Sequence, residues 1–388
     1  MKRVLFVIPG LGHGGTNRSM KNLIGQIGNG DIDIEILALC GEGIYRDDFE
    51  KYLQNSAQAI TEALGTLGKR RAKESLLSYL WRVWWKLIYV GLLRRSNEKL
   101  NALIGKRLKK INYDMVIAFQ ESAATGLAIH IPANRHIAWV RCDYENYVNS
   151  KKHFESEEPI YAQYDKIVCV SGYTAQVFRD FYPNLKDKVL HIYNMIDDRG
   201  IIASSKEKIT DDRFVRDGIM LVSVGRFAKE KRFALIPGMC VELKKRGVRF
   251  KWYLIGDHGD EKPVILERIK EYGVEDSLIL LGEKANPYPY IAQADILVCT
   301  SYTEACPNVV NEAKILHVPV VAADFPSAYE FINHGENGFI VPVEEMASLL
   351  IDLCEKKEKL KKVKDGISGF VYDNAQIKKQ ISELIMRG

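Results

Sequence analysis

Residues 301–312 read Ser301-Tyr302-Thr303-Glu304-Ala305-Cys306-Pro307-Asn308-Val309-Val310-Asn311-Glu312. The apolar run at residues 296–300 precedes this stretch and predicts a short buried strand. Pro307 suits the first position of a helix, because proline has a fixed φ and the amide hydrogen that it lacks is not needed there. Glu304 would then lie in the loop, and Glu312 about 7 to 8 Å along the helix axis. The stretch therefore predicts a helix start with a carboxylate on either side of it.

The start of this predicted helix favours an anionic ligand. Cys306 is a poor N-cap, so the amides of Asn308 and Val309 lack an obvious side-chain acceptor and lie at the positive end of the helix dipole. A bound anion would accept hydrogen bonds from these amides. The spacing also fits a plainer interpretation, in which Glu304 merely favours the helix N-terminus and Glu312 lies on a solvated face.

Strands alternate with helical patterns along the rest of the chain. Strands are predicted at residues 4–9, 32–40, 115–119, 136–140, 167–170 and 189–193, and then at 220–224, 252–255, 278–281, 296–300, 320–323 and 339–341. Several are continuous apolar runs, which are typical of parallel strands covered on both faces. The polar segment 197–217 has no periodicity and predicts a linker. We expect an α/β protein with two doubly wound, Rossmann-like domains, at 1–196 and 218–365, that face one cleft.

The composition indicates a cytoplasmic enzyme. The chain has 388 residues, enough for two domains, and its seven cysteines are scattered without a C-x-x-C pair. Most of these cysteines lie in apolar runs, so we expect buried thiols rather than disulfides or a zinc site. The apolar run before Pro9 is too short for a signal peptide or a membrane span.

The positive charge is concentrated in one segment. Residues 68–112 contain thirteen Lys or Arg and two Glu, a net charge of +11, whereas the whole chain carries +5 and the remainder therefore −6. The segment also holds three of the five tryptophans, Trp81, Trp84 and Trp85, which share one helical arc with neighbouring leucines. This pattern predicts a basic amphipathic helix that binds an anionic membrane surface through residues 69–110. Packing of this face onto the domain core is the alternative. No nucleic-acid-binding motif accompanies the charge, so we expect no nucleic-acid partner.

A glycine-bearing loop follows the first strand of each predicted domain. In the first domain, Gly14 and Gly15 precede a helix and allow a ligand to approach the backbone, although a glycine-rich loop alone is weak evidence. In the second, residues 224–232 contain four cations at the carboxyl end of a strand, where ligands bind in open α/β sheets. A pair such as Arg226 and Lys231 would match a diphosphate. A solvated basic loop is the alternative.

Taken together, these elements resemble the retaining GT-B glycosyltransferases of family 4 over nearly the whole chain. The motifs that carry the resemblance are Arg226 with Lys231, Glu304 with Glu312, Gly256-Asp257-His258-Gly259, Gly335-Glu336-Asn337-Gly338-Phe339 and, in the first half, Gly14-Gly15-Thr16-Asn17-Arg18. The resemblance implies the GT-B fold, with a C-terminal helix in residues 366–388 that returns to the N-terminal domain. It also implies transfer of a sugar from a nucleoside-diphosphate sugar, with uridine expected as the base, to a hydroxyl of a glycan or lipid-linked acceptor. The expected setting is bacterial cell-surface polysaccharide synthesis, with the protein bound peripherally to the inner face of the cell membrane.

The resemblance assigns roles to individual residues. Arg226, Lys231 and Glu304 would be catalytic: the two cations would hold the donor diphosphate without a metal or cofactor, and Glu304 would contact the donor sugar. The donor-binding residues would be Glu312 at the ribose, with Pro307, Asn308, Val309 and Gly256. On the acceptor side the candidates are Gly14, Gly15 and Asp143, the last either as an acceptor-binding residue or as a structural carboxylate of its loop.

The chain also departs from the family pattern. Ala305 stands where glycine is usual, and Arg141 stands where the family often has a histidine, so no histidine role is carried over. Two other functions therefore stay open: a sugar-nucleotide epimerase of the same architecture, which would act without an acceptor, and a degenerate sugar-nucleotide binding subunit.

Overall fold

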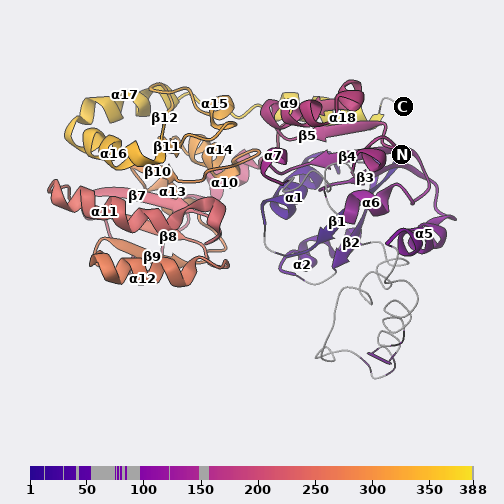
Figure 1. Cartoon of the computed structure of the whole chain (residues 1–388), viewed down its shortest axis with the longest axis horizontal. Coiled ribbons are helices and arrows are strands. Elements are labelled where there is room, and N and C mark those ends of the chain that lie inside the picture. The colour runs from indigo at the N-terminus through magenta and orange to yellow at the C-terminus, as the bar shows by residue number, and fades with distance from the viewer. Residues whose placement is uncertain are drawn as a thin grey trace. The chain divides into compact units, whose positions relative to one another are not determined.

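The structure, a computed structural model, describes residues 1–12, 14–28, 30–40, 43–53, 75, 77, 79–80, 84, 97–121, 123–147 and 157–386. The chain forms two compact units (Figure 1). Unit 1 comprises Met1–Met195 and Asn374–Gly388, and unit 2 comprises Ile196–Asp373. The chain therefore passes from one unit to the other twice, after Met195 and after Asp373.

Unit 1 is built on a six-stranded parallel sheet with the order β2-β1-β3-β4-β5-β6. Its strands are β1 (Lys2–Gly10), β2 (Ile32–Cys40), β3 (Tyr113–Ala118), β4 (Ala133–Val140), β5 (Lys166–Cys169) and β6 (Val189–His191). Its helices include α1 (Gly15–Ile27), α2 (Arg46–Phe49), α5 (Asn97–Leu108), α6 (Ala123–Ala128), α7 (Tyr144–Tyr147), α9 (Gly172–Phe181) and α18 (Asn374–Met386). The strand order reverses between β1 and β3, and we call such a place the switch point of the sheet. Doubly wound sheets bind their ligands there, at the carboxyl ends of the strands.

The last helix of unit 1 comes from the far end of the chain. Helix α18 contributes buried apolar side chains such as Ile381 and Ile385. Arg135 of β4 donates a hydrogen bond from Nη1 to the carbonyl oxygen of Leu384, at 2.9 Å. Unit 1 is therefore completed by a segment that follows the whole of unit 2 in the sequence.

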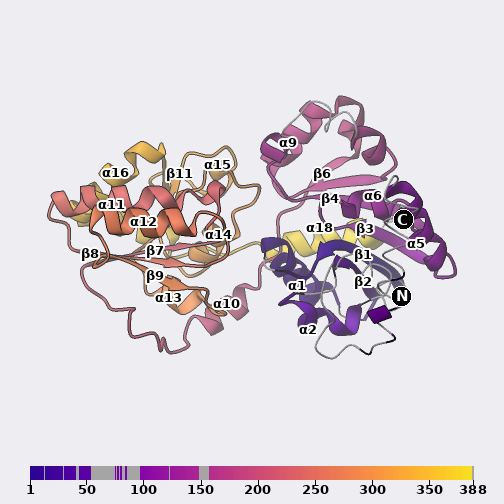
Figure 2. The ribbon, with the colours of Figure 1, turned by 60° about the horizontal axis from the view of Figure 1, so that its bottom comes forward.

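Unit 2 repeats the plan with the strand order β12-β11-β10-β7-β8-β9. Its strands are β7 (Ile219–Val224), β8 (Phe250–Ile255), β9 (Leu278–Gly282), β10 (Ile296–Cys299), β11 (Val320–Ala323) and β12 (Gly338–Val341). Its helices are α10 (Asp198–Ser204), α11 (Ile236–Lys245), α12 (Lys262–Tyr272), α13 (Tyr288–Ala292), α14 (Asn308–Ile315), α15 (Ala328–Phe331), α16 (Met346–Glu355) and α17 (Lys357–Ile367). Helices cover both faces of the sheet, with α11 and α12 on one face and α13 on the other (Figure 2). Here the switch point lies between β7 and β10.

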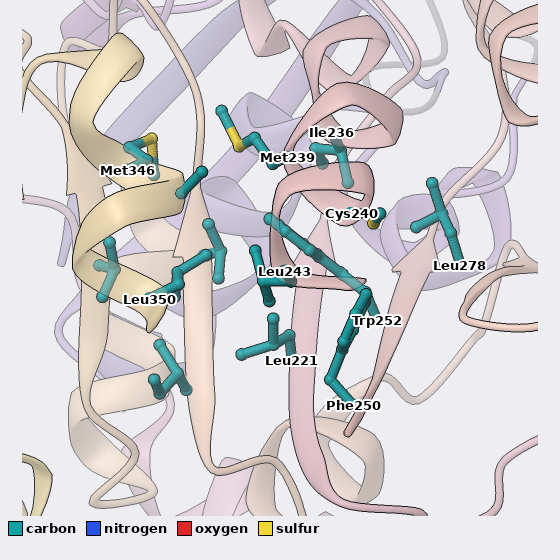
Figure 3. Close-up of a cluster of buried hydrophobic side chains, with 14 of the residues drawn as sticks. Leu221, Ile236, Met239, Cys240, Leu243, Phe250, Trp252, Leu278, Met346 and Leu350 are labelled. Atoms are coloured by element: carbon teal, nitrogen blue, oxygen red, sulfur yellow. The ribbon is translucent and has the colours of Figure 1, made fainter. Parts of the chain in front are cut away.

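The core of unit 2 packs helices α11 and α16 against the sheet. Figure 3 shows side chains of these helices meeting those of β7 and β8, among them Leu243, Leu350, Leu221 and Trp252. The core also satisfies its polar groups: Trp252 Nε1 donates to Ser223 Oγ at 3.1 Å, and Ser223 Oγ donates to the carbonyl oxygen of Val298 at 2.7 Å. These bonds join the three central strands β8, β7 and β10.

The prediction of two doubly wound α/β domains is confirmed, and every predicted strand corresponds to one of β1–β12 within a few residues. The boundaries between the domains differ from the expected ones. The segment 197–217, predicted as a linker, belongs to unit 2 and contains α10, because Asp197 Oδ1 accepts a hydrogen bond from the amide of Gly200 and Ile201 packs against Ile315 of α14. The predicted last segment, 366–388, is divided between the units at Asp373.

Candidate functional site

The switch point of unit 2 brings Lys231 and Glu304 together. Lys231 lies in the 3-10 turn Lys229–Lys231, which follows β7, and Glu304 lies in the loop that follows β10. Strands β7 and β10 are neighbours in the sheet, so their carboxyl ends bring the two residues to the same place. Lys231 Nζ donates to Glu304 Oε1 at 2.5 Å. Two residues predicted to be catalytic therefore form an ion pair at the edge where such sheets bind ligands.

Lys231 is held along both its stem and its backbone. A Cβ atom on Gly225 would lie 3.4 Å from Cε and 3.6 Å from Cδ of Lys231, so the lysine stem packs on the glycine at this position. Thr300 Oγ1 donates to the carbonyl oxygen of Lys231 at 2.5 Å. Because Thr300 directly follows β10, this bond ties the turn after β7 to the loop that leads to Glu304.

Glu304 is fixed at its carboxylate and at its backbone. Ser301 Oγ donates to Oε1 at 2.8 Å, and Ser327 Oγ, from the loop between β11 and α15, donates to the carbonyl oxygen of Glu304 at 2.6 Å. Oε1 thus accepts hydrogen bonds from both Lys231 and Ser301, whereas Oε2 accepts none from the part of the chain that the structure describes. The two described hydrogen bonds to this carboxylate therefore converge on one oxygen.

The ion pair keeps Lys231 protonated. Burial lowers the pKa of Lys231, but the negative charge of Glu304 and its hydrogen bond raise it by more, so the pKa lies above the ordinary lysine value. The positive charge of Arg226 opposes this rise. The site therefore carries a charged ammonium group, already partly neutralised, at physiological pH.

Arg226 occupies a more exposed place than Lys231. Its Nη2 donates to Glu230 Oε1 at 2.8 Å, and its side chain is 57% exposed. Its charge lowers the pKa of Lys231, so the two cations act on one region. The structure places the lysine in the half-buried pair and the arginine at the solvent-exposed rim.

The predicted donor-binding residue Gly256 packs against the same loop. Gly256 has a φ of 145°, and a Cβ atom there would lie 1.9 Å from the carbonyl oxygen of Gly225. Gly259 approaches Phe227 in the same way, with its Cβ position 2.0 Å from the Phe227 carbonyl oxygen. The glycines after β8 therefore let that loop lie directly on the loop that carries Arg226.

Helix α14 begins at Asn308, so Pro307 occupies the N-cap position rather than the first helical one. The side chain of this N-cap residue makes no capping hydrogen bond, and Asn308 and Val309 lie in the first turn of the helix, at the positive end of its dipole. Glu312 is only 2% exposed. This burial rules out the alternative in which Glu312 lies on a solvated helix face.

In unit 1 the predicted glycine loop follows β1 at the switch point. Gly14 precedes α1 with a φ of 154°, and Gly15 is the first residue of α1. Asn17 Nδ2 donates to the carbonyl oxygens of Gly10 and Gly12, at 3.0 and 2.8 Å. The side chain of Asn17 thus folds the loop back onto the end of the strand.

Asp143, the predicted acceptor-side carboxylate, holds the start of α7. Its Oδ1 accepts from the amide of Glu145 at 3.1 Å, and its Oδ2 accepts from Asn146 Nδ2 at 2.8 Å. Asp143 is itself buried. These contacts agree with the structural role that the sequence left open for this residue.

A second buried carboxylate, Glu121, lies beside that loop and was not predicted. Its Oε2 accepts from the amide of Arg141 at 2.8 Å, and Arg141 Nη2 donates to Asn194 Oδ1 at 2.6 Å. Burial raises the pKa of Glu121, although the hydrogen bond from the Arg141 amide opposes the rise. Glu121 comes just after β3 at the switch point of unit 1, so the strand-end rule that selected Glu304 could have found it.

Most of the basic segment 69–110, including Trp81 and Trp85, lies outside the described residues. Within the described part, Leu77, Leu80 and Trp84 are 81%, 53% and 56% exposed. Their spacing puts them on one face of a helix. The alternative in which this face packs onto the core therefore does not hold for these three side chains. No helix in the described ranges has both the length and the apolar character needed to cross a membrane.

All seven cysteines are free thiols. Cys299, at the end of β10, is buried next to the ion pair, and this burial raises the pKa of its thiol. Among the described residues, no three His, Cys, Asp or Glu side chains are grouped so as to hold a metal ion.

Comparisons with known proteins agree with this geometry. Residues 205–368 match the family of glycosyl transferases group 1. The N-acetylgalactosamine-N,N'-diacetylbacillosaminyl-diphospho-undecaprenol 4-alpha-N-acetylgalactosaminyltransferase of Campylobacter jejuni is 32% identical over 159 residues, which cover 41% of this chain and 41% of the relative. The N-acetyl-alpha-D-glucosaminyl L-malate synthase of Bacillus anthracis is 24% identical over 225 residues, which cover 57% and 58%. The chain thus spans about two fifths to three fifths of the length of these relatives.

The likeness of fold extends over the whole chain. The crystal structure of Anabaena HepE in complex with UDP and glucose superimposes with a TM-score of 0.73 at 17% identity, and the match covers 100% of both chains. At this identity the match shows the fold, which is GT-B. Residues 205–368 of this chain are therefore similar to the group 1 glycosyl transferases, within a GT-B fold of two doubly wound units.

Proposed function

We propose that this protein is a retaining glycosyltransferase, which moves a sugar from a nucleoside-diphosphate sugar to a hydroxyl of a glycan or lipid-linked acceptor. The observation that carries the proposal is the Lys231–Glu304 ion pair at the switch point of unit 2. The match of residues 205–368 to group 1 glycosyl transferases supports the reaction type. The UDP named in the HepE complex supports uridine as the base.

The donor would bind through its charges and its hydroxyls. The ammonium group of Lys231, the guanidinium of Arg226 and the first amides of α14 would hold the diphosphate, so the proposed reaction needs no metal ion. Glu304 Oε2 would accept a hydrogen bond from one hydroxyl of the sugar. Glu312 would accept hydrogen bonds from the ribose.

The transfer breaks the bond between the anomeric carbon and the diphosphate oxygen, and the bonding electrons stay with the diphosphate. The acceptor oxygen forms its new bond on the same face of the sugar, and its proton passes to the departing diphosphate. Negative charge therefore develops where Lys231 and Arg226 lie, and preorganised cations at such a position stabilise the transition state.

The acceptor side of the proposal is a lipid-linked glycan at a membrane. The name of the Campylobacter jejuni relative includes diphospho-undecaprenol, and two other relatives are named for amylovoran biosynthesis and for lipopolysaccharide core biosynthesis. The +11 segment and the exposed side chains of Leu77, Leu80 and Trp84 support peripheral association with an anionic membrane surface. We assign the protein to bacterial cell-surface polysaccharide synthesis at the inner face of the cell membrane.

The test is acceptor-dependent release of nucleotide. Purified protein is incubated with UDP-glucose, UDP-galactose, UDP-N-acetylglucosamine or GDP-mannose, with and without polyprenyl-diphosphate glycans, and free nucleotide is measured. A transferase releases nucleotide only when an acceptor is present, and NMR of the product gives the anomeric configuration. An epimerase alters the sugar without any acceptor. A binding subunit shows only a thermal shift, since a ligand at a hundredfold excess over Kd stabilises by about 2.7 kcal/mol.

A further inference from the structure

We infer that Ser301 and Ser327 are positioning residues, which hold Glu304 on Lys231 and reserve its Oε2 for the donor sugar. The inference rests on the proposed function for the identity of the ligand. Its structural part, the orientation of the carboxylate, concerns only unit 2.

The two hydroxyls hold Glu304 at different points and from different elements. Ser301 follows β10 and donates to the carboxylate, whereas Ser327 follows β11 and donates to the backbone carbonyl. Both serines are buried, with exposures of 1% and 0%. Their hydrogen bonds therefore form away from bulk water, where the low dielectric makes such bonds electrostatically stronger.

Ser301 makes the two carboxylate oxygens of Glu304 unequal. An ion pair with Lys231 alone could use either oxygen, because the carboxylate can rotate about its terminal bond. Ser301 donates to the oxygen that Lys231 also binds, so that oxygen accepts two bonds and the other is left for a ligand. A lost or altered hydroxyl at position 301 would restore the equivalence.

Ser327 restrains the loop from the other side. Residues 300–307 connect β10 to α14 without regular structure, so the position of Glu304 depends on contacts outside its own strand. The bond from Ser327 Oγ to the carbonyl oxygen of Glu304, at 2.6 Å, supplies such a contact from the neighbouring strand end. The carboxylate and its backbone are thus held independently.

Ser223 offers a matched control. It is equally buried, at 0% exposure, and its Oγ donates to a backbone carbonyl at 2.7 Å, that of Val298. It lies in the same unit, within the core, and contacts neither Lys231 nor Glu304 through these bonds. Replacement of Ser223 by Ala therefore measures the general effect of losing one buried serine hydroxyl.

The first experiment needs no ligand. Acetylation of lysines by a dilute acylating reagent is followed by mass spectrometry in wild type and in Ser301→Ala, Ser327→Ala and Ser223→Ala. We expect Lys231 to react several-fold faster in Ser327→Ala, where the loop that carries Glu304 loses its restraint, and at the wild-type rate in Ser301→Ala, where either oxygen of Glu304 still pairs with Lys231. The rate for Lys231 in Ser223→Ala should equal that of wild type. Equal rates for Lys231 in all four proteins would overturn the inference.

The second experiment compares nucleotide with sugar nucleotide. Binding of UDP and of UDP-glucose is measured by calorimetry. If the nucleotide-release test identifies another sugar nucleotide as the donor, that donor and its nucleoside diphosphate are used instead. Ser301→Ala should lower the affinity for the sugar nucleotide about tenfold and leave the affinity for the nucleotide unchanged. Ser301→Thr keeps the hydroxyl and should therefore recover most of the lost affinity for the sugar nucleotide. Equal weakening of both ligands would mean that Ser301 acts only in folding. If wild type releases no nucleotide with any acceptor, the proposed function fails, whereas the labelling of Lys231 still decides whether Ser327 holds Glu304 against Lys231.

Discussion

Gly256 and Gly225 are in direct backbone contact: a Cβ atom on Gly256 would lie 1.9 Å from the carbonyl oxygen of Gly225. Gly256 also has a φ of 145°, which side chains of L-residues rarely allow. We expect Gly256→Ala to lower the free energy of unfolding by about 2 to 4 kcal/mol and to raise the donor KM, because it displaces the loop on which Lys231 packs. Urea denaturation and steady-state kinetics measure both effects. Gly369→Ala, where a Cβ atom meets nothing within 4 Å, is the control. Wild-type values for Gly256→Ala would contradict the packing described.

Removal of either cation should slow the chemical step. Lys231→Ala and Arg226→Ala are each expected to lower kcat by roughly 10² to 10³, as loss of one preorganised partner of a developing anion does. Only Lys231→Ala should also lower the free energy of unfolding, because it leaves the half-buried carboxylate of Glu304 without its cation, whereas Arg226 is exposed. Lys229→Ala, an exposed cation in the same turn, should behave as wild type. A kcat near that of wild type in both variants would remove these residues from the mechanism. Addition of EDTA should leave the rate unchanged.

Glu312→Gln keeps the shape of the side chain but removes its charge. If Glu312 accepts hydrogen bonds from the ribose, the variant should bind the donor more weakly by about 1.5 to 3 kcal/mol, which appears as a higher donor KM. A donor that carries 2′-deoxyribose tests this directly, because it lacks one of the hydroxyls in question. Its KM should therefore differ less between wild type and Glu312→Gln than the KM of the natural donor does. If the deoxy donor reveals the same difference as the natural one, Glu312 does not bind the ribose.

Lys314 predicts a pH dependence of stability. Burial lowers the pKa of this lysine to about 8, with Nζ donating to the carbonyl oxygen of Phe331 at 2.5 Å and lying 4.1 Å from the ring centroid of Phe370. The ordinary lysine pKa is about 10.4, so between these values the unfolded chain binds more protons than the native one. The contribution of Lys314 to the free energy of unfolding should therefore rise by about 3 kcal/mol from pH 8 to pH 10.4 and stay flat below pH 8.

The measurement is the difference in unfolding free energy between wild type and Lys314→Met across this pH range. Subtraction cancels the other titrating groups, since the variant retains them. A difference that does not change between pH 8 and pH 10.4 would show that Lys314 titrates alike in the native and unfolded states.

The basic segment predicts salt-sensitive binding to vesicles. Five cations within reach of an anionic surface would contribute roughly 5 kcal/mol before screening. Co-sedimentation with anionic vesicles should therefore exceed that with neutral ones, and high salt should abolish the excess. Replacement of Trp81, Trp84 and Trp85 by Ser should remove vesicle binding while the melting temperature stays unchanged. A fall in stability of several kcal/mol would instead place these rings in a core.

The site in unit 2 was predictable because its key residues sit at strand ends. Continuous apolar runs locate β7 and β10, and ligands bind at the carboxyl ends of such strands, so Lys231 and Glu304 could each be selected from the sequence. The sheet order, in which β7 and β10 are neighbours, brings the two residues together. The serines could not be selected in this way. Ser327 reaches Glu304 from a third strand end, and a serine at a turn most often bonds its own backbone.

The acceptor side was less predictable for a related reason. Asp143 has the residue type and the strand-end position of a ligand-binding carboxylate, yet both its oxygens serve the first turn of α7. The sequence does not reveal that Asp143 caps a four-residue helix, because aspartate is common both at helix N-termini and in ligand-binding sites. Glu121 has the strand-end position of a candidate just after β3, but the sequence does not show that its carboxylate is buried.

The origin of α18 has a consequence for the order in which this protein matures on the ribosome. The strands of unit 1 emerge before unit 2, but α18, which packs Ile381 and Ile385 into their core and whose Leu384 carbonyl accepts a hydrogen bond from Arg135, emerges after it. Unit 2 is continuous from Ile196 to Asp373 and has all its strands before then. Unit 1 is thus begun before unit 2 and completed after it, and until α18 has emerged the apolar surface that α18 covers stays exposed, where a chaperone can bind.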